Sequence, residues 1–243
     1  MRNVVLRPSS SGQSVRELHL ALNSRLNPSP NLFVDGLYTL QTERAVLDFQ
    51  RSNWLEMDGI AGPCTLDALH GTEASPVILH NVVYLAQPTP TTCWAAATAM
   101  LTGTSIQAVQ MTTPQRLLAT DGSLICKAEP IQRLEIHQAF AHFHRLRYQP
   151  PQSWPVAVLI NLLRNGPIML EISHNQASFL PGLTPMGHYV VIVGARGSHA
   201  ADGSSTTLRI YDPDDSQGEA IYSVVYGSML SRAPLSTFGM FTQ

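Results

Sequence analysis

The chain has 243 residues, of which 44% are hydrophobic and 13% charged, so it can bury a sizeable core as one large domain or two smaller ones. Its 15 Lys and Arg residues nearly balance 17 Asp and Glu residues, and the formal charge is only −2 at pH 7. This balance argues against nucleic acid or an anionic membrane as the main partner.

The cysteines and the amino terminus bear on where the protein works. The chain has an odd number of cysteines, with no CxxC pair: Cys64, Cys93 and Cys126. This argues against a scaffold held together by disulfide bonds. Residues 1–15 lack the apolar run of a signal peptide, and no stretch reaches the length of a membrane span. We therefore expect synthesis in the cytoplasm, with export to the periplasm or to a target cell requiring a dedicated secretion system.

Residues 12–70 contain an internal repeat that predicts a small helical unit. The stretches DGLYTLQT (35–42) and DGIAGPCT (58–65) each begin with Asp-Gly and end with Thr. Asp-Gly favours a turn with positive φ, and the threonine can cap a following helix. A helical face precedes the repeat, with apolar residues at spacings of three and four: Val15, Leu18, Leu22 and Leu26. We therefore expect three helices.

This stretch resembles the small three-helix peptidoglycan-binding domain. The family pattern is matched by residues 15–22, 35–50 and 55–69, although LYTL follows the first Asp-Gly where the family commonly keeps a second glycine. The resemblance implies that residues 1–72 form a module that binds the bacterial cell wall. A spacer, or a contact for another protein, remains the alternative use of the same fold.

A second domain is expected over residues 83–243. Residues 73–82 lose the helical period and contain Pro76, so they read as a linker. Helical patterns follow first, and β-branched or aromatic runs with turn signals follow later: helices at 92–102, 129–145 and 154–165, then strands at 167–173, 188–195, 206–213 and 220–226. This order predicts an α+β fold with an antiparallel sheet.

Cys93 stands out within QPTPTTCWAAATAM (87–100), between a Thr/Pro-rich turn and an alanine-rich helix. Thr91 or Thr92 can cap that helix, which would place Cys93 in its first turn. Unpaired N–H groups and the helix dipole favour a thiolate there. The alternative is a structural thiol, because free cysteines are commonly small buried hydrophobes.

A thiolate nucleophile needs a proton acceptor that a third polar group holds in place. His188 is the candidate acceptor, since it begins an apolar strand directly after Gly187. Asp212 ends the next predicted strand, where a hairpin would bring it beside His188. Asp214 and Asp215 are close enough to compete, but they lie beyond a proline and are expected to face solvent. Alone, His188 could be a satisfied core histidine and Asp212 a turn former.

Gln87 completes the set, since its amide can act with the Cys93 N–H on a developing oxyanion. Gln87, Cys93, His188 and Asp212 follow in the chain order of the papain-like cysteine peptidases, which the sequence resembles, and NGPIMLEI (165–172) is a further likeness. The resemblance implies that these four residues are catalytic. TPTT replaces glycines common before the cysteine, and Asp212 replaces the asparagine of plant enzymes, which places the chain nearer the compact bacterial members.

The remaining candidates have less specific roles. Trp94 and Gly187 are assigned to the substrate site, Trp94 as a hydrophobic wall beside the catalytic pair and Gly187 for close backbone access. Cys64 and Cys126 are interpreted as structural. A zinc hydrolase is a poor fit because HExxH is missing and no ligand-spaced partners accompany three helical histidines, His137, His142 and His144. No cofactor is required.

The sequence therefore predicts a two-domain cysteine hydrolase that docks on peptidoglycan and cleaves an amide bond. Its substrate is either a protein or the peptide stem of peptidoglycan, and the residues do not choose between them. The architecture suggests an exported antibacterial effector or toxin with an immunity or secretion partner, or an enzyme released by lysis. The rival is a non-catalytic wall-binding or adaptor protein with an inactive papain-like half.

Overall fold

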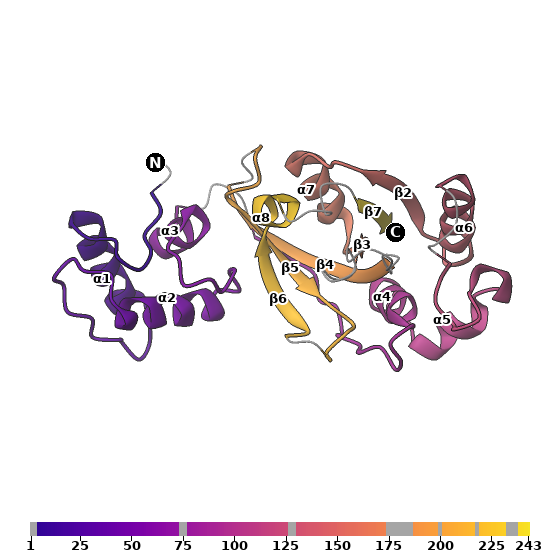
Figure 1. The fold of residues 1–243 in the computed structure, drawn as a ribbon, viewed down its shortest axis with the longest axis horizontal. Coiled ribbons are helices and arrows are strands. Elements are labelled where there is room, and N and C mark those ends of the chain that lie inside the picture. Colours follow the sequence, from indigo (N-terminus) through magenta and orange to yellow (C-terminus); the bar gives the residue numbers. More distant parts are fainter. Residues whose placement is uncertain are drawn as a thin grey trace, which may run out of the picture. The chain divides into compact units, whose positions relative to one another are not determined.

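The computed structural model describes residues 4–72, 77–125, 130–173, 187–198, 201–216, 219–231 and 238–243. The chain divides into two compact units. The first contains Met1–Val77, Arg196–Leu208 and Ser223–Ser228, and the second contains Ile78–Ala195, Arg209–Tyr222 and Met229–Gln243. Within residues 4–72 the first unit is helical, and the second unit holds most of the sheet (Figure 1).

The helical part of the first unit has α1 (Gln13–Arg25), α2 (Leu40–Ser52) and α3 (Pro63–His70). The apolar spacing seen in the sequence accounts for their packing, because one face of each helix is buried. The shared core includes the following buried side chains: Val15, Leu18, Leu22, Val46, Phe49 and Leu69. The expectation of three helices is confirmed over this part of the chain.

The repeated turns are built differently from the expectation. Gly36 and Gly59 do adopt positive φ, at 83° and 67°. Thr39, however, is the N-cap of α2, and Thr42 lies in the first turn, where its hydroxyl accepts the Thr39 N–H at 3.2 Å. In α3 the N-cap is Gly62. The threonines of the repeat therefore lie in the first turns of the helices and not at the N-cap, which corrects their predicted position, although Thr42 still takes part in the capping box of α2.

In the described part of the chain, one sheet has the strand order β2-β7-β3-β4-β5-β6, and β1 pairs with β4 outside that path. The pairs β1/β4, β3/β4, β3/β7 and β2/β7 are antiparallel. The strands are β1 (Ile78–Leu79), β2 (Arg147–Gln152), β3 (Ile168–Ser173), β4 (Gly187–Gly197), β5 (Thr206–Tyr211), β6 (Ile221–Val225) and β7 (Phe238–Thr242). The predicted α+β class with an antiparallel sheet is confirmed.

The helices that follow the first three are α4 (Cys93–Thr102), α5 (Ile106–Thr112), α6 (Pro130–Phe143), α7 (Val156–Asn165) and α8 (Tyr226–Ser231), with a short 3₁₀ turn at Gln115–Leu117. Helix α4 lies beside β3, and α6 lies beside β2 (Figure 1). Every residue of α4 from Cys93 to Leu101 is buried. Its alanines allow this close approach, and the Thr98 hydroxyl reaches the Met169 sulfur of β3 at 3.6 Å.

The first of the boundaries between the units lies between Val77 and Ile78, inside the stretch 73–82 that was expected to be a linker. Ile78 and Leu79 within that stretch form β1, paired with Ala195 and Gly194 of β4. None of the helices found in the described ranges is long and apolar enough to cross a membrane.

Candidate active site

Cys93 is the first residue of α4, directly after the N-cap residue Thr92. The Thr92 hydroxyl donates to the Thr89 carbonyl at 2.9 Å and makes no capping bond, so the turn before the helix is closed by Thr89 and Thr92. The Cys93 residue is 6% exposed. Its N–H is one of those at a helix start that have no acceptor within the helix. The predicted place in the first turn is therefore correct.

His188 and Asp212 lie side by side in the second unit. Strands β4 and β5 are neighbours in the sheet, and His188 Nε2 is 2.6 Å from Asp212 Oδ1. The His188 side chain also hydrogen-bonds the side chain of Cys93. The structure thus brings Cys93, His188 and Asp212 together in one line of hydrogen bonds.

The electrostatics of His188 follow from this line. Burial acts to lower the pKa of His188, but the hydrogen bonds and charges of Asp212 and Cys93 outweigh it and raise that pKa to about 10. An imidazole is stabilised as imidazolium when a carboxylate and a thiolate flank it. His188 is therefore charged across the neutral range, and it can stabilise a thiolate at Cys93.

The loop after β5 fixes the carboxylate of Asp212. The backbone N–H of Asp212 donates to the Ala220 carbonyl at 2.7 Å, and the Asp212 carbonyl accepts from the Tyr84 hydroxyl at 3.0 Å. The side-chain Oδ1 of Asp212 accepts from the Asp214 N–H at 2.9 Å. The Oδ1 atom of Asp214 accepts from the Ser216 N–H at 3.0 Å and from the Ser216 hydroxyl at 2.6 Å. Of the acidic residues that could compete for His188, Asp212 is therefore the one that makes the contact.

Gln87 belongs to the same region. Its backbone N–H donates to the carbonyl of Pro213, the residue after Asp212, at 2.8 Å. Its side-chain Oε1 is buried with no hydrogen-bond partner among the described residues. This ties Gln87 to the turn that carries Asp212, while its action on an oxyanion stays a prediction.

A pocket of about 110 Å³ adjoins the predicted nucleophile. Cys93, Trp94 and Gly187 all line it, so both residues assigned to the substrate site border this space. The other wall is the 119–125 segment, which the sequence analysis did not single out. The indole N–H of Trp94 donates to the Gly122 carbonyl at 3.1 Å, so Trp94 supports this wall as well as lining the pocket.

The residues set aside in the sequence lie away from these contacts or outside the described residues. Cys64 is buried in the first unit, and its thiol donates to the Ser204 carbonyl at 3.4 Å. Cys126 falls outside the described residues. The Nε2 atom of His144 lies 2.8 Å from the Thr113 hydroxyl. Within the described residues, no group of three or more His, Cys, Asp or Glu side chains could hold a metal ion.

A buried polar cluster beneath α6 also escaped the sequence analysis. Glu171 of β3 is 3% exposed and forms an ion pair with Arg133, and it accepts from the Tyr148 hydroxyl at 3.2 Å. His137 Nε2 lies 2.7 Å from the Tyr189 hydroxyl. Burial lowers the pKa of His137. Glu171 reads in the sequence as the polar position of an alternating strand, and nothing local marks it as buried.

Comparison with known families gives two matches. The family described as "Papain-like cysteine protease AvrRpt2" matches residues 76–226, which include all four predicted catalytic residues. The family described as "Putative peptidoglycan binding domain" matches residues 11–69, which include α1, α2 and all of α3 except its last residue, His70.

Individual relatives share shorter stretches. The zinc D-Ala-D-Ala carboxypeptidase of Streptomyces albus G is 32% identical over 79 residues, which is 32% of this chain and 31% of that protein. The SleB N-terminal domain is 32% identical and covers 30% of this chain and 96% of its own, with a TM-score of 0.27. The Burkholderia AP3 phage endolysin is 24% identical over 50% of this chain and 43% of its own, with a TM-score of 0.26.

Proposed function

Because the chain belongs to the family of papain-like cysteine proteases described as AvrRpt2, we propose that it cleaves amide bonds with Cys93 as the nucleophile. The observation that carries this proposal is the position of His188, which hydrogen-bonds Cys93 on one side and Asp212 on the other. A nucleophile, a base and a group that orients the base are the parts that covalent acyl transfer needs.

The proposed reaction begins with a thiolate at Cys93 and an imidazolium at His188. The sulfur attacks the amide carbonyl, and the oxyanion accepts hydrogen bonds from the Cys93 N–H and the Gln87 carboxamide. His188 gives its proton to the leaving amine as the C–N bond breaks, which leaves a thioester on Cys93. His188 then takes a proton from water, and the resulting hydroxide hydrolyses the thioester and frees the carboxylic acid. Asp212 orients the ring in each step.

The assignment is tested with the full-length chain and its Cys93→Ala and His188→Ala variants on casein and on purified peptidoglycan. We expect both variants to lose turnover, by about 10²–10⁴-fold for His188→Ala. Unchanged turnover in either variant rules out the assigned pair. Mapping the iodoacetamide adduct gives an independent check, since an inert Cys93 at neutral pH supports a non-catalytic adaptor.

We further propose that the substrate is the peptide stem of peptidoglycan. The match of residues 11–69 to a peptidoglycan-binding family supports this choice, because such a module holds the enzyme where its substrate is concentrated. Release of peptides from purified peptidoglycan, identified by mass spectrometry, is the expected result. Turnover of casein without any release from peptidoglycan would point to a protein substrate.

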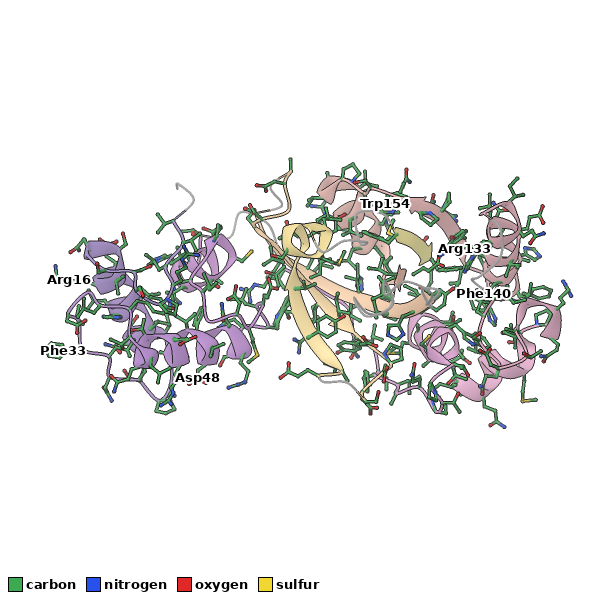
Figure 2. The ribbon with its side chains drawn as sticks, viewed as in Figure 1. Arg16, Phe33, Asp48, Arg133, Phe140 and Trp154 are labelled. Carbon is green, nitrogen blue, oxygen red and sulfur yellow. The ribbon has the colours of Figure 1, made fainter. Side chains whose placement is uncertain are left out.

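Exposed apolar side chains of the helical module are the proposed contact with the wall. Phe33 is 80% exposed and projects away from the ribbon (Figure 2), and Leu20, Leu37 and Leu40 are 58%, 53% and 60% exposed. Exposed apolar groups gathered on one small unit indicate a binding surface. We expect Phe33→Ser in an inactive Cys93→Ala background to weaken sedimentation with insoluble peptidoglycan. Met111→Ser is the matched control, because Met111 is 78% exposed in the second unit.

An antibacterial effector is the biological role that fits a peptidase directed to the cell wall. To test it, the chain would be expressed in a bacterium with an added export signal that delivers it to the periplasm. We expect growth to stop with the unaltered chain and to continue with Cys93→Ala. Normal growth in both cases removes the support for this role.

A further inference from the structure

The pocket beside Cys93 combines an apolar floor with an acidic rim. Trp94, Leu124 and Tyr189 line it and are 1%, 2% and 2% exposed. Asp121 lines the same pocket but is exposed to solvent. Among the described residues that border this space, Asp121 is the only carboxylate, and no Lys, Arg or His borders it. The lining that the structure describes is therefore largely apolar and carries one negative charge, on an exposed residue.

The polar atoms of the two aromatic residues are already engaged. The Trp94 indole N–H donates to the Gly122 carbonyl at 3.1 Å, and the Tyr189 hydroxyl lies 2.7 Å from His137 Nε2. His137 is fully buried, so the Tyr189 hydroxyl is held in the core. What these residues offer to a substrate is mainly ring surface, which favours methylene groups over polar ones.

The carboxylate of Asp121 is held in place by its own turn. Its Oδ1 accepts from the Ser123 N–H at 3.0 Å and from the Ser123 hydroxyl at 2.6 Å. The Asp121 carbonyl also accepts from the Thr91 hydroxyl at 2.9 Å, which fastens the turn to the segment just before Cys93. The negative charge is thus positioned at a fixed place relative to the predicted nucleophile.

We propose that this pocket selects a substrate residue whose side chain has an aliphatic stem and an ammonium tip, which is the chemistry of lysine and of other diamino acids. The methylenes pack on the ring surface, and the ammonium stays near water beside Asp121, as amphipathic side chains do at an apolar surface with a polar edge. This inference rests on the proposed peptidase function and names the substrate class of the same site.

The test uses full-length protein and a set of fluorogenic peptides. One series of peptides varies the residue directly before the cleaved bond, and a second series varies the residue before that one. The varied residue is lysine, glutamate, or norleucine, which has a similar stem without the charge. At one position we expect kcat/KM for lysine to exceed that for norleucine by about threefold to fivefold, the range of an exposed ion pair, with glutamate lowest. This preference should shrink as salt is added, because exposed charges are screened.

Asp121→Asn is the decisive variant, since asparagine can still accept the Ser123 hydrogen bonds. We expect it to abolish the lysine preference by lowering kcat/KM for the lysine peptide to the value for the norleucine peptide. Asp202→Asn is a matched control: Asp202 precedes Gly203 and Ser204 in a turn with the same two hydrogen bonds, at 3.0 Å and 2.8 Å, and it lies in the first unit. Asp202→Asn should keep the lysine preference.

The outcomes separate the two levels of the proposal. Turnover of the peptides with no preference for lysine at either position, or a preference that survives Asp121→Asn, overturns the assignment of the pocket and leaves the peptidase function standing. If no peptide and no peptidoglycan is turned over, the peptidase function fails, and the inference about its specificity fails with it.

Discussion

His188 Nε2 lies 2.6 Å from Asp212 Oδ1, and the two residues come from neighbouring strands of one sheet. Their side chains are 5% and 15% exposed, so the contact is shielded from water. A hydrogen bond to a carboxylate in such surroundings sets both the orientation and the charge of the imidazole. The chemistry assigned to Cys93 therefore depends on the loop after β5 as much as on α4.

Asp212→Ala should slow peptide hydrolysis by about 10²–10⁴-fold, because His188 loses the group that orients it. The same change should lower the pKa of His188 from about 10 toward its ordinary value of 6.5, since the hydrogen bond to Asp212 is the main cause that raises it. The pH dependence of Cys93 alkylation would report this change. Asp215→Ala, an exposed neighbour, is the control, and an equal loss in both variants contradicts the assignment of Asp212.

The stability of the protein should depend on pH through His188. Its pKa is about 10 in the folded chain against 6.5 as the ordinary value, so the folded state binds the proton more tightly. The stabilisation is fully present below pH 6.5 and is lost as the pH rises from there through about 10. Urea unfolding at several pH values should show this decline, and His188→Gln should flatten it. A decline of equal size in His188→Gln would assign it to other groups.

Local sequence patterns predicted much of the fold. Helices α4, α6 and α7 and strands β3 to β6 each lie close to their expected places. The signal is clearest in α7, which has one apolar face, and in the strands, which carry runs of β-branched residues. Strand β2 carries Pro150 and Pro151, which are poor strand residues and are tolerated at the edge of the sheet, where β2 lies. Strand β7 is short, and its place between β2 and β3 depends on contacts distant in sequence.

The candidate site likewise contains residues that the sequence predicts and residues that it does not. Cys93, His188, Asp212 and Gln87 are recognisable because their residue types and order carry chemical meaning. The pocket wall at 119–125 is not, because its position depends on long-range hydrogen bonds to Thr91 and Trp94. Glu171 likewise has partners that no local pattern discloses, such as Arg133, 38 residues away.

The ion pair between the partly exposed Arg133 and the buried Glu171 should cost stability when one partner is removed and much less when both are replaced. Arg133→Met leaves Glu171, whose side chain is 2% exposed, without its ion-pair partner, and we expect the free energy of unfolding to fall by about 3 kcal/mol. Replacing both, Arg133→Met with Glu171→Leu, should recover most of that loss. Urea denaturation of the two single variants and the double variant measures the coupling. Additive losses in the double variant would show that the two side chains act independently.

The alanines of α4 should tolerate no larger side chain. Ala97 is fully buried in the core between α4 and the sheet, so Ala97→Leu must displace neighbours in a closely packed interior. We expect it to lower the free energy of unfolding by about 1–3 kcal/mol and to lower Tm. Ala157→Leu on α7 makes the same change at an exposed helical position and should be close to neutral. Because α4 begins at Cys93, the Ala97 variant should also lose peptidase activity. Full stability and activity in Ala97→Leu would mean that α4 is not held tightly against the sheet.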